Sequence, residues 1–430
     1  MTVDLNLFFA LLGGLLVLAF VANRLVRYTR VPDVIILMIT GVLIGPVLHW
    51  VNPDLFRGVT RGFGALALLL ILFEGGLDLK LREILKNFAG GFFLSVTCYA
   101  LSMMAVAAVS ARMQQLGWRH ALLVGAVLGC VSSSIVLPVL QQVKLRREVR
   151  VTLLVEATLG DALAVLAVTT LLDIAAGANA SAKDIVWSLG SSLLLGLAVG
   201  ILAGMAWSYL LPVLSDQHFW HVLTFGAVLL VYAGVHALNG NSLVGVLVFG
   251  LTLANFPEIR RQYASSDSYS QSNWFAQYSE NRGAGKAAEK PAHLEMHTFH
   301  AELAFLIRTF FFVLLGVRLN FAAFRSGAAF ALACFVVLLA ARWIAVQSGW
   351  LLWRKFTGLE REIMVWFFPR GLITAVLGIQ AFDAMGSEYR FLPDLAFAII
   401  LLTNLMLLVG AIRARRLPMP ETLEVKDAAS

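Results

Sequence analysis

Residues 130–168 read CVSSSIVLPVLQQVKLRREVRVTLLVEATLGDALAVLAV. Two apolar runs flank a short basic loop, and the second run contains two carboxylates, Glu156 and Asp161. A carboxylate at the centre of a bilayer costs about 2.5–3.5 kcal/mol even on the most lenient insertion scales, so such residues usually mark a functional site. We interpret this stretch as half of an ion-binding site.

The composition is that of a polytopic membrane protein. Of the 430 residues, 59% are hydrophobic and 14% are charged, and the mean hydropathy is +0.81, which is far from the range of soluble domains. The net charge of +7 does not indicate a nucleic-acid partner, because the basic residues lie in short loops between apolar runs. Cys98, Cys130 and Cys334 lie within apolar runs, so we expect no disulfide framework. We expect no cofactor and no resident metal.

We expect an all-α protein with thirteen membrane-spanning helices, because thirteen hydrophobic runs approach the roughly 20 residues that a crossing helix needs. Only Asn239, Gly240 and Asn241 separate the eighth run from the ninth. The runs are 5–23, 32–49, 62–78, 88–110, 119–141, 150–175, 185–209, 219–238, 241–256, 299–317, 326–352, 363–385 and 392–412.

The basic residues predict the orientation. If the N-terminus lies outside, 22 of the 33 basic residues fall in cytoplasmic segments and 8 in outer segments. Cytoplasmic loops of membrane proteins carry such an excess of Lys and Arg. The sequence therefore predicts a multi-pass protein of the cell (inner) membrane, with its N-terminus outside and its C-terminus in the cytoplasm.

A polar segment at residues 257–298 interrupts the hydrophobic pattern. It is rich in Ser, Tyr, Gln and Asn, and we expect a cytoplasmic loop between two membrane halves, 1–256 and 299–416. Halves of similar hydropathy favour inverted repeats, the common plan of secondary transporters. Residues 417–430 are expected to form a short cytoplasmic tail without a soluble regulatory domain.

Asp161 is the first candidate for the ion site. It lies near the middle of the run 150–175, among small residues and without a basic neighbour in that run. Burial favours the neutral form of a carboxyl group, so this group can hold either a proton or a cation. A group that binds either a proton or a cation, but not both, can exchange one for the other. The alternative is a structural carboxylate that is hydrogen-bonded to another helix.

Glu156 is predicted to have a different role. At 100° per residue it points about 140° away from Asp161 on a helix, so the two carboxylates need not share an ion. Arg342 is the basic residue nearest the centre of the run 326–352, and a buried arginine is very costly without an acid. We predict that Glu156 and Arg342 form a structural ion pair, which leaves Asp161 free to titrate.

The run 119–141 contains residues that interrupt a helix. They are Ser132, Ser133, Ser134 and Pro138. Pro138 removes a backbone donor, and serines such as Ser133 and Ser134 can satisfy freed carbonyls or bind a cation. Transporters build ion sites from broken helices of this kind. We therefore name both serines, with Asp161, as candidate cation and proton ligands. The alternative is a proline kink with serines bonded back to the carbonyl four residues earlier.

The run 363–385 has the same interrupted character at Pro369, Arg370 and Gly371. Arg370 is predicted to lie in a second broken helix, near its cytoplasmic entry; the alternative is that it extends to the membrane interface. A further cluster, His293, His297 and His300, would line one face of a helix as a pH sensor or weak metal site, or be ordinary polar residues beside the membrane.

Taken together, these motifs resemble the monovalent cation/proton antiporter superfamily, most closely its NhaP-like and sodium/hydrogen-exchanger branch. Residues 156–161, EATLGD, are similar to the family's Glu-Ser-x-x-Asn-Asp. Arg342 is similar to the arginine that pairs with that glutamate, and residues 368–371, FPRG, resemble a Gly-x-Arg-Gly run. The sequence FEGGLDL at 73–79 is also typical of the family.

The resemblance implies thirteen helices, a dimerisation domain in a homodimer, and a core domain that moves like an elevator. Its crossing helices would be 119–141 and 363–385, with Asp161 as the shared site for a proton and for Na⁺ or K⁺. Ser133-Ser134-Ile135 stands where the family often has Thr-Asp-Pro, and Ala157 and Gly160 replace a serine and an asparagine. We therefore expect fewer oxygen ligands and acceptance of K⁺. A single titrating carboxylate also favours one-for-one, electroneutral exchange.

Two other classes of membrane protein, an intramembrane protease and a cation channel, share features with this sequence. An intramembrane aspartyl protease needs two aspartates that share a proton, and the predicted spans provide no Tyr-Asp partner for Asp161. A cation channel or potassium-efflux system of the same fold usually carries a nucleotide-binding tail, which these 430 residues do not include. The sequence therefore favours a secondary transporter over an enzyme or a channel.

Overall fold

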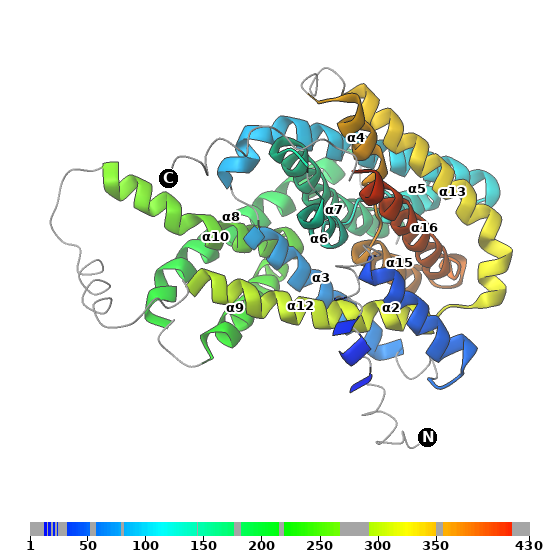
Figure 1. Ribbon diagram of the computed structural model, residues 1–430, viewed down its shortest axis with the longest axis horizontal. Coiled ribbons are helices and arrows are strands. Elements are labelled where there is room, and N and C mark those ends of the chain that lie inside the picture. Colours follow the sequence, from blue (N-terminus) through cyan, green and yellow to red (C-terminus); the bar gives the residue numbers. More distant parts are fainter. Residues whose placement is uncertain are drawn as a thin grey trace. The chain divides into compact units, whose positions relative to one another are not determined.

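The computed structural model describes residues 32–51, 57–78, 81–143, 145–175, 182–214, 219–266, 292–349 and 356–414, together with isolated positions between 13 and 24. Helices make up these ranges, and none of the described residues belongs to a strand (Figure 1). The prediction of an all-α fold is confirmed. The first predicted span, 5–23, lies largely outside the described residues, as do residues 267–291 and the tail 417–430.

The described helices match the remaining predicted spans. They are α2 (Asp33–Val42) with the π-helical turn η1 (Leu43–Val47), α3 (Arg57–Asp78), α4 (Leu81–Met113), α5 (Trp118–Leu128), α6 (Ser133–Gln142), α7 (Arg147–Ala175), α8 (Ala182–Leu214), α9 (Trp220–Ala237), α10 (Ser242–Ser266), α12 (Ala292–Val317), α13 (Phe321–Ser348), α14 (Gly358–Trp366), α15 (Leu372–Met385), the 3-10 turn η3 (Gly386–Tyr389) and α16 (Leu392–Arg413).

Several of these helices are long and apolar enough to cross a bilayer. By length and composition, 7 helices of the described part qualify, and four shorter apolar helices accompany them. The predicted separation of the eighth and ninth spans is present, because α9 ends at Ala237 and α10 begins at Ser242. The polytopic character is thus confirmed, while the count of thirteen spans stays a prediction.

Both predicted interruptions occur, and the first lies at Ser132 and the residues before it rather than at Pro138. α5 ends at Leu128 and α6 begins at Ser133, so the break covers residues 129–132 and Pro138 lies inside α6. The second break covers residues 367–371, between α14 and α15. Each interrupted span therefore consists of two half-helices that end within the membrane.

Contacts between residues divide the chain into two units. The first comprises residues 1–68, 82–189 and 305–430, and the second comprises residues 69–81 and 190–304. In the first unit α7 packs against α5, α6 and α15, and α16 packs against α13, α14 and α15. In the second unit α9 packs against α10. This grouping differs from the predicted halves 1–256 and 299–416, and the inverted repeat stays a prediction.

Glycines allow two helices of the first unit to touch through their backbones. A Cβ at Gly41 of α2 would lie 2.1 Å from the carbonyl oxygen of Val313, and one at Gly316 of α12 would lie 2.3 Å from that of Met38. Small residues permit such close approach between membrane helices. The α2–α12 pair is therefore a closely packed support in the first unit.

We predict that Gly316→Ala lowers the thermal unfolding midpoint in detergent, because the added methyl group must displace backbone. Overpacking of this kind typically costs about 1–3 kcal/mol. Gly62→Ala is the matched control, because Gly62 is exposed on α3 and no atom lies within 4 Å of its added Cβ. An equal midpoint for the two variants would contradict the close α2–α12 packing.

Candidate functional site

The two helix breaks meet in the first unit. The backbone N–H of Ser132 donates to the carbonyl oxygen of Pro369 at 2.9 Å, which joins the first break to the second. A Cβ at Gly371 would lie 2.3 Å from Ser132 Oγ, so a larger residue at this crossing would have to displace the Ser132 side chain. The Sγ of Cys130 lies 3.7 Å from Thr374 Oγ1 across the same junction. Two segments that are far apart in sequence thus form one centre.

Helix α7 brings Asp161 to this centre. The Asp161 side chain is fully buried, and its Oδ2 accepts hydrogen bonds from the backbone N–H of Ser133 at 3.1 Å and from Ser133 Oγ at 2.5 Å. Ser133 is the first residue of α6. The N-terminus of a helix is the positive end of its dipole and favours an anion. The carboxylate is therefore held at the positive end of a half-helix.

The other oxygen of Asp161, Oδ1, is not held by Ser133. Within the described residues, Oδ1 is buried and has no hydrogen-bond partner, and the same is true of Ser95 Oγ. Gly160 leaves room beside them, because a Cβ there would approach Ser95 Oγ only to 3.7 Å and the Val131 carbonyl oxygen only to 3.8 Å. A space too narrow for a water molecule lies beside this turn of α7 and is lined by Ser95, Cys130, Glu156 and Gly160. One carboxylate oxygen is thus anchored, and the other is available.

The two predicted serine ligands are placed differently. Ser133 contacts Asp161, whereas the Ser134 hydroxyl lies 3.0 Å from Ser132 Oγ. The Ser134 carbonyl oxygen is the acceptor that the missing N–H of Pro138 leaves without its helical donor. Arg308 Nη1 of α12 donates to it at 3.0 Å, and Arg308 Nη2 lies 3.3 Å from Asp33 Oδ2. An arginine, rather than a serine, satisfies the carbonyl that the proline freed.

Glu156 and Arg342 lie together, as predicted. Arg342 donates to Glu156 in a buried ion pair between α13 and α7. The same guanidinium donates to the carbonyl oxygens of Met364 at 2.7 and 2.9 Å and of Phe367 at 3.0 Å, where α14 ends. The final turn of a helix leaves carbonyls without partners. Arg342 therefore neutralises Glu156 and also caps a half-helix.

Arg370 is fully buried in the second break, so it does not extend to the membrane interface. Its Nε donates to the carbonyl oxygen of Leu128, the last residue of α5, at 2.7 Å, and its Nη1 donates to that of Phe368 at 3.1 Å. No carboxylate forms an ion pair with it in the described part of the chain. Its charge is placed at the negative ends of half-helices, where cations are favoured.

Two polar residues of α16 hold the second break and were not singled out from the sequence. Thr403 Oγ1 accepts from the Arg370 N–H at 2.9 Å, and Asn404 Nδ2 donates to the Arg370 carbonyl oxygen at 2.9 Å. Both side chains are buried. The signal was present, because Thr-Asn in the otherwise apolar run LLTNLML marks polar groups that need partners inside a membrane.

The predicted histidine cluster is only partly described. His300 is buried in the second unit, and its ring lies 5.0 Å from that of Phe73 and 5.2 Å from that of Phe299. The side chains of His293 and His297 lie outside the described residues. Among the described side chains there is no group of three or more His, Cys, Asp or Glu residues that fits a metal ion.

The family model of the sodium/hydrogen exchanger, transmembrane, matches residues 15–415. The chain belongs to this family. The superfamily that the motifs around Asp161, Arg342 and Arg370 indicated is thereby confirmed. The matched residues include every member of the buried centre.

Individual relatives are more distant. The K⁺/H⁺ antiporter NhaP2 of Shewanella sp. (strain ANA-3) is 24% identical over 421 residues, which is 94% of this chain and 65% of the relative. The chain therefore spans 65% of the length of that relative. The Na⁺/H⁺ antiporter 1 of Methanocaldococcus jannaschii is 21% identical over 227 residues, 52% of this chain and 53% of the relative.

The structure of the sodium proton antiporter MjNhaP1 from Methanocaldococcus jannaschii at pH 8 superposes with a TM-score of 0.73 at 20% identity. The match covers 96% of this chain and 99% of that one. At this identity the likeness establishes the fold.

We predict that Glu156→Gln and Arg342→Gln each destabilise the protein by about 3–5 kcal/mol, because either change leaves an unpaired charge in a buried site. Arg342→Gln should be the more severe, since it also removes donors from the α14 carbonyls. The double variant should be more stable than the sum of the single losses predicts. Thermal unfolding in detergent measures all three.

Arg325→Gln, an exposed change on the same helix α13, should alter stability by no more than about 0.5 kcal/mol. If the losses of the two single variants simply add in the double variant, Glu156 and Arg342 are not energetically coupled.

Proposed function

We propose that this protein is a secondary active transporter that exchanges a monovalent cation, Na⁺ or K⁺, for protons at Asp161. The observation that carries the proposal is a fully buried carboxylate with one oxygen held by Ser133 and the other without a partner among the described residues. Membership of the sodium/hydrogen exchanger family supports it. The names of the relatives, K⁺/H⁺ and Na⁺/H⁺ antiporters, agree with this class of substrates.

The chemistry follows from the exclusive occupancy of one carboxylate. When Asp161 is protonated, its charge is lost and a cation gains little from binding. When it is ionised, the free oxygen Oδ1 can coordinate a cation, and the N-terminus of α6 and Ser133 hold the other oxygen in place. Proton and cation therefore compete for the same group, and a cycle that carries each in turn performs exchange.

We propose one-for-one, electroneutral exchange. Glu156 is engaged by Arg342, and Arg370 is placed on the backbone carbonyls of Leu128 and Phe368. Asp161 is thus the carboxylate at the crossing that is free to change its charge during the cycle. A second titrating acid, which would make the cycle move net charge, is not needed.

We further propose that the ion site is exposed alternately to each side by an elevator-like movement of a core that contains the two broken helices. The protein would act as a homodimer in the inner membrane, with its N-terminus outside and its C-terminus in the cytoplasm. The likeness of the fold to a solved antiporter supports the mechanism, and the distribution of basic residues supports the orientation.

Asp161→Asn should fold and insert but lose cation-dependent proton flux in reconstituted vesicles, because a neutral amide cannot exchange a proton for a cation. Asp383→Asn is the matched control, since it neutralises an exposed aspartate on α15, and it should keep the wild-type rate. In the wild-type protein, raising the pH should lower the cation concentration that gives half-maximal exchange. Substantial flux through Asp161→Asn would overturn the proposal.

The selectivity of the site should be weak, with K⁺ accepted, because residues 157 and 160 provide no side-chain oxygen. Gly160→Ser should raise the rate with Na⁺ relative to K⁺, since a Cβ at this position makes only ordinary contacts and the hydroxyl adds a side-chain oxygen one residue from Asp161. Gly160→Ala adds the same carbon without an oxygen and should leave the ratio unchanged.

The measurement is dye-monitored exchange in proteoliposomes with Na⁺, Li⁺ and K⁺, with the membrane potential clamped and unclamped. Strict Na⁺ selectivity of the wild-type protein would contradict the ligand argument. A rate that follows the imposed potential would contradict one-for-one exchange.

A further inference from the structure

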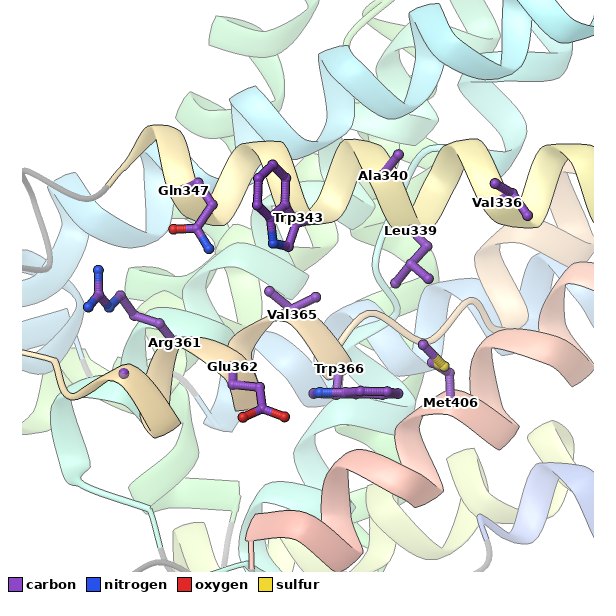
Figure 2. A pocket seen from close by; sticks show the side chains of 11 residues that line it. Val336, Leu339, Ala340, Trp343, Gln347, Arg361, Glu362, Val365, Trp366 and Met406 are labelled. Atoms are coloured by element: carbon purple, nitrogen blue, oxygen red, sulfur yellow. The ribbon is translucent and has the colours of Figure 1, made fainter.

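A deep groove lies on the first unit between α13, α14 and α16. Its volume is about 790 Å³, within the range of sites for small organic molecules. Figure 2 shows that its walls are largely apolar: Leu339 and Trp343 approach from α13, Val365 and Trp366 from α14, and Met406 from α16. Trp343 is 55% exposed although its neighbour Arg342 is fully buried. The groove therefore lies on a different face of α13 from the Glu156 ion pair.

One end of this groove is polar and carries a positive charge. Figure 2 shows Gln347 and Arg361 at that end and Val336 at the other. Glu362 forms an ion pair with Arg413, whose guanidinium lies 4.6 Å from the ring centroid of Trp366. Arg361 has no ion-pair partner among the described residues, and its Nε is buried without a hydrogen-bond acceptor. An unsatisfied guanidinium nitrogen is costly and favours an anionic ligand.

The order of these groups matches the order of groups in a phospholipid. The polar end contains residues of the segment that the positive-inside pattern places at the cytoplasmic surface, where anionic lipids attract Lys and Arg. Below it lie two indole rings, which favour the headgroup level of a bilayer, and then aliphatic side chains. A free inorganic anion would use only the first of these features, and an uncharged hydrocarbon only the last.

We propose that this groove binds one anionic phospholipid, with its phosphate on Arg361 and an acyl chain along Leu339, Trp343 and Met406. The lipid would connect α13 to α14. These are the helices whose buried faces hold Arg342 and the carbonyls of Met364 and Phe367. Lipid binding therefore stabilises the supports of the ion site without contacting the ion, and it does not depend on which cation is transported.

The test is native mass spectrometry of the purified full chain titrated with phosphatidylglycerol, with phosphatidylcholine as the lipid of zero net charge. We expect one phosphatidylglycerol per chain to be retained preferentially. Arg361→Gln should weaken this binding by about tenfold or more, which corresponds to the loss of a charge-assisted hydrogen bond. Arg361→Lys keeps the charge and should lose less. Ala340→Phe should reduce binding by filling the groove.

Two matched variants provide the controls. Arg325→Gln removes an exposed arginine, and Ala329→Phe adds a ring at an exposed alanine; both lie on α13 away from the groove, and both should retain the lipid. The thermal midpoint of each variant in detergent shows that it is folded. Added phosphatidylglycerol should raise the midpoint of the wild-type protein and raise that of Arg361→Gln less, because a ligand stabilises only the state that binds it.

Three results would overturn the proposal. The first is equal retention of both lipids by the wild-type protein and Arg361→Gln, which would indicate ordinary surrounding lipid. The second is displacement of the lipid by inorganic phosphate alone, which would indicate a site for a free anion. The third is loss of a dimer, with lipid binding unchanged, in Ala340→Phe, which would indicate that a second copy of the chain occupies the groove.

Discussion

Two helices that stop inside the membrane leave backbone groups that no water can satisfy, and the arrangement of the site follows from this constraint. In a bilayer, irregular backbone is tolerated only where protein groups replace the missing hydrogen bonds. Here the backbone N–H of Ser132 in the first break donates a hydrogen bond to the carbonyl oxygen of Pro369 in the second. Arg370 and Arg342 then supply donors to the carbonyl ends of α5 and α14. At the N-terminus of α6, the carboxylate of Asp161 accepts a hydrogen bond from the backbone N–H of Ser133.

The positions of Arg342, Arg370 and Asp161 therefore follow from the unpaired backbone groups at the ends of the half-helices. Arg342 and Arg370 lie where backbone carbonyls are concentrated, and the carboxylate of Asp161 lies at the N-terminus of α6, where N–H groups are concentrated. Glu156 balances Arg342, so that pair contributes no net charge. In this distribution the Glu156–Arg342 pair is distinct from Asp161, the group at which we propose exchange.

Much of this arrangement could be predicted from the sequence. Glu156, Asp161, Arg342 and Arg370 stand out because ionisable residues in apolar runs are expensive, and runs of about 20 residues predicted the helices. Composition could not specify which backbone atoms those side chains would meet. Ser132 and Pro138 both predicted an interruption of the run 119–141. The chain breaks at residues 129–132, whereas α6 continues through Pro138, and Arg308 from a distant helix donates to the Ser134 carbonyl oxygen there.

The contact between Arg308 and Ser134 also has a consequence for how the sequence can vary. The Ser134 carbonyl needs an outside donor only because residue 138 is proline and lacks an N–H. If residue 138 had an N–H, that N–H would donate to the Ser134 carbonyl within the helix. Arg308 would then be needed only for its contact with Asp33. Positions 138 and 308, which are 170 residues apart, are therefore expected to co-vary among related chains. The residue type at position 308 in α12 is thus expected to depend on whether position 138 in α6 is proline.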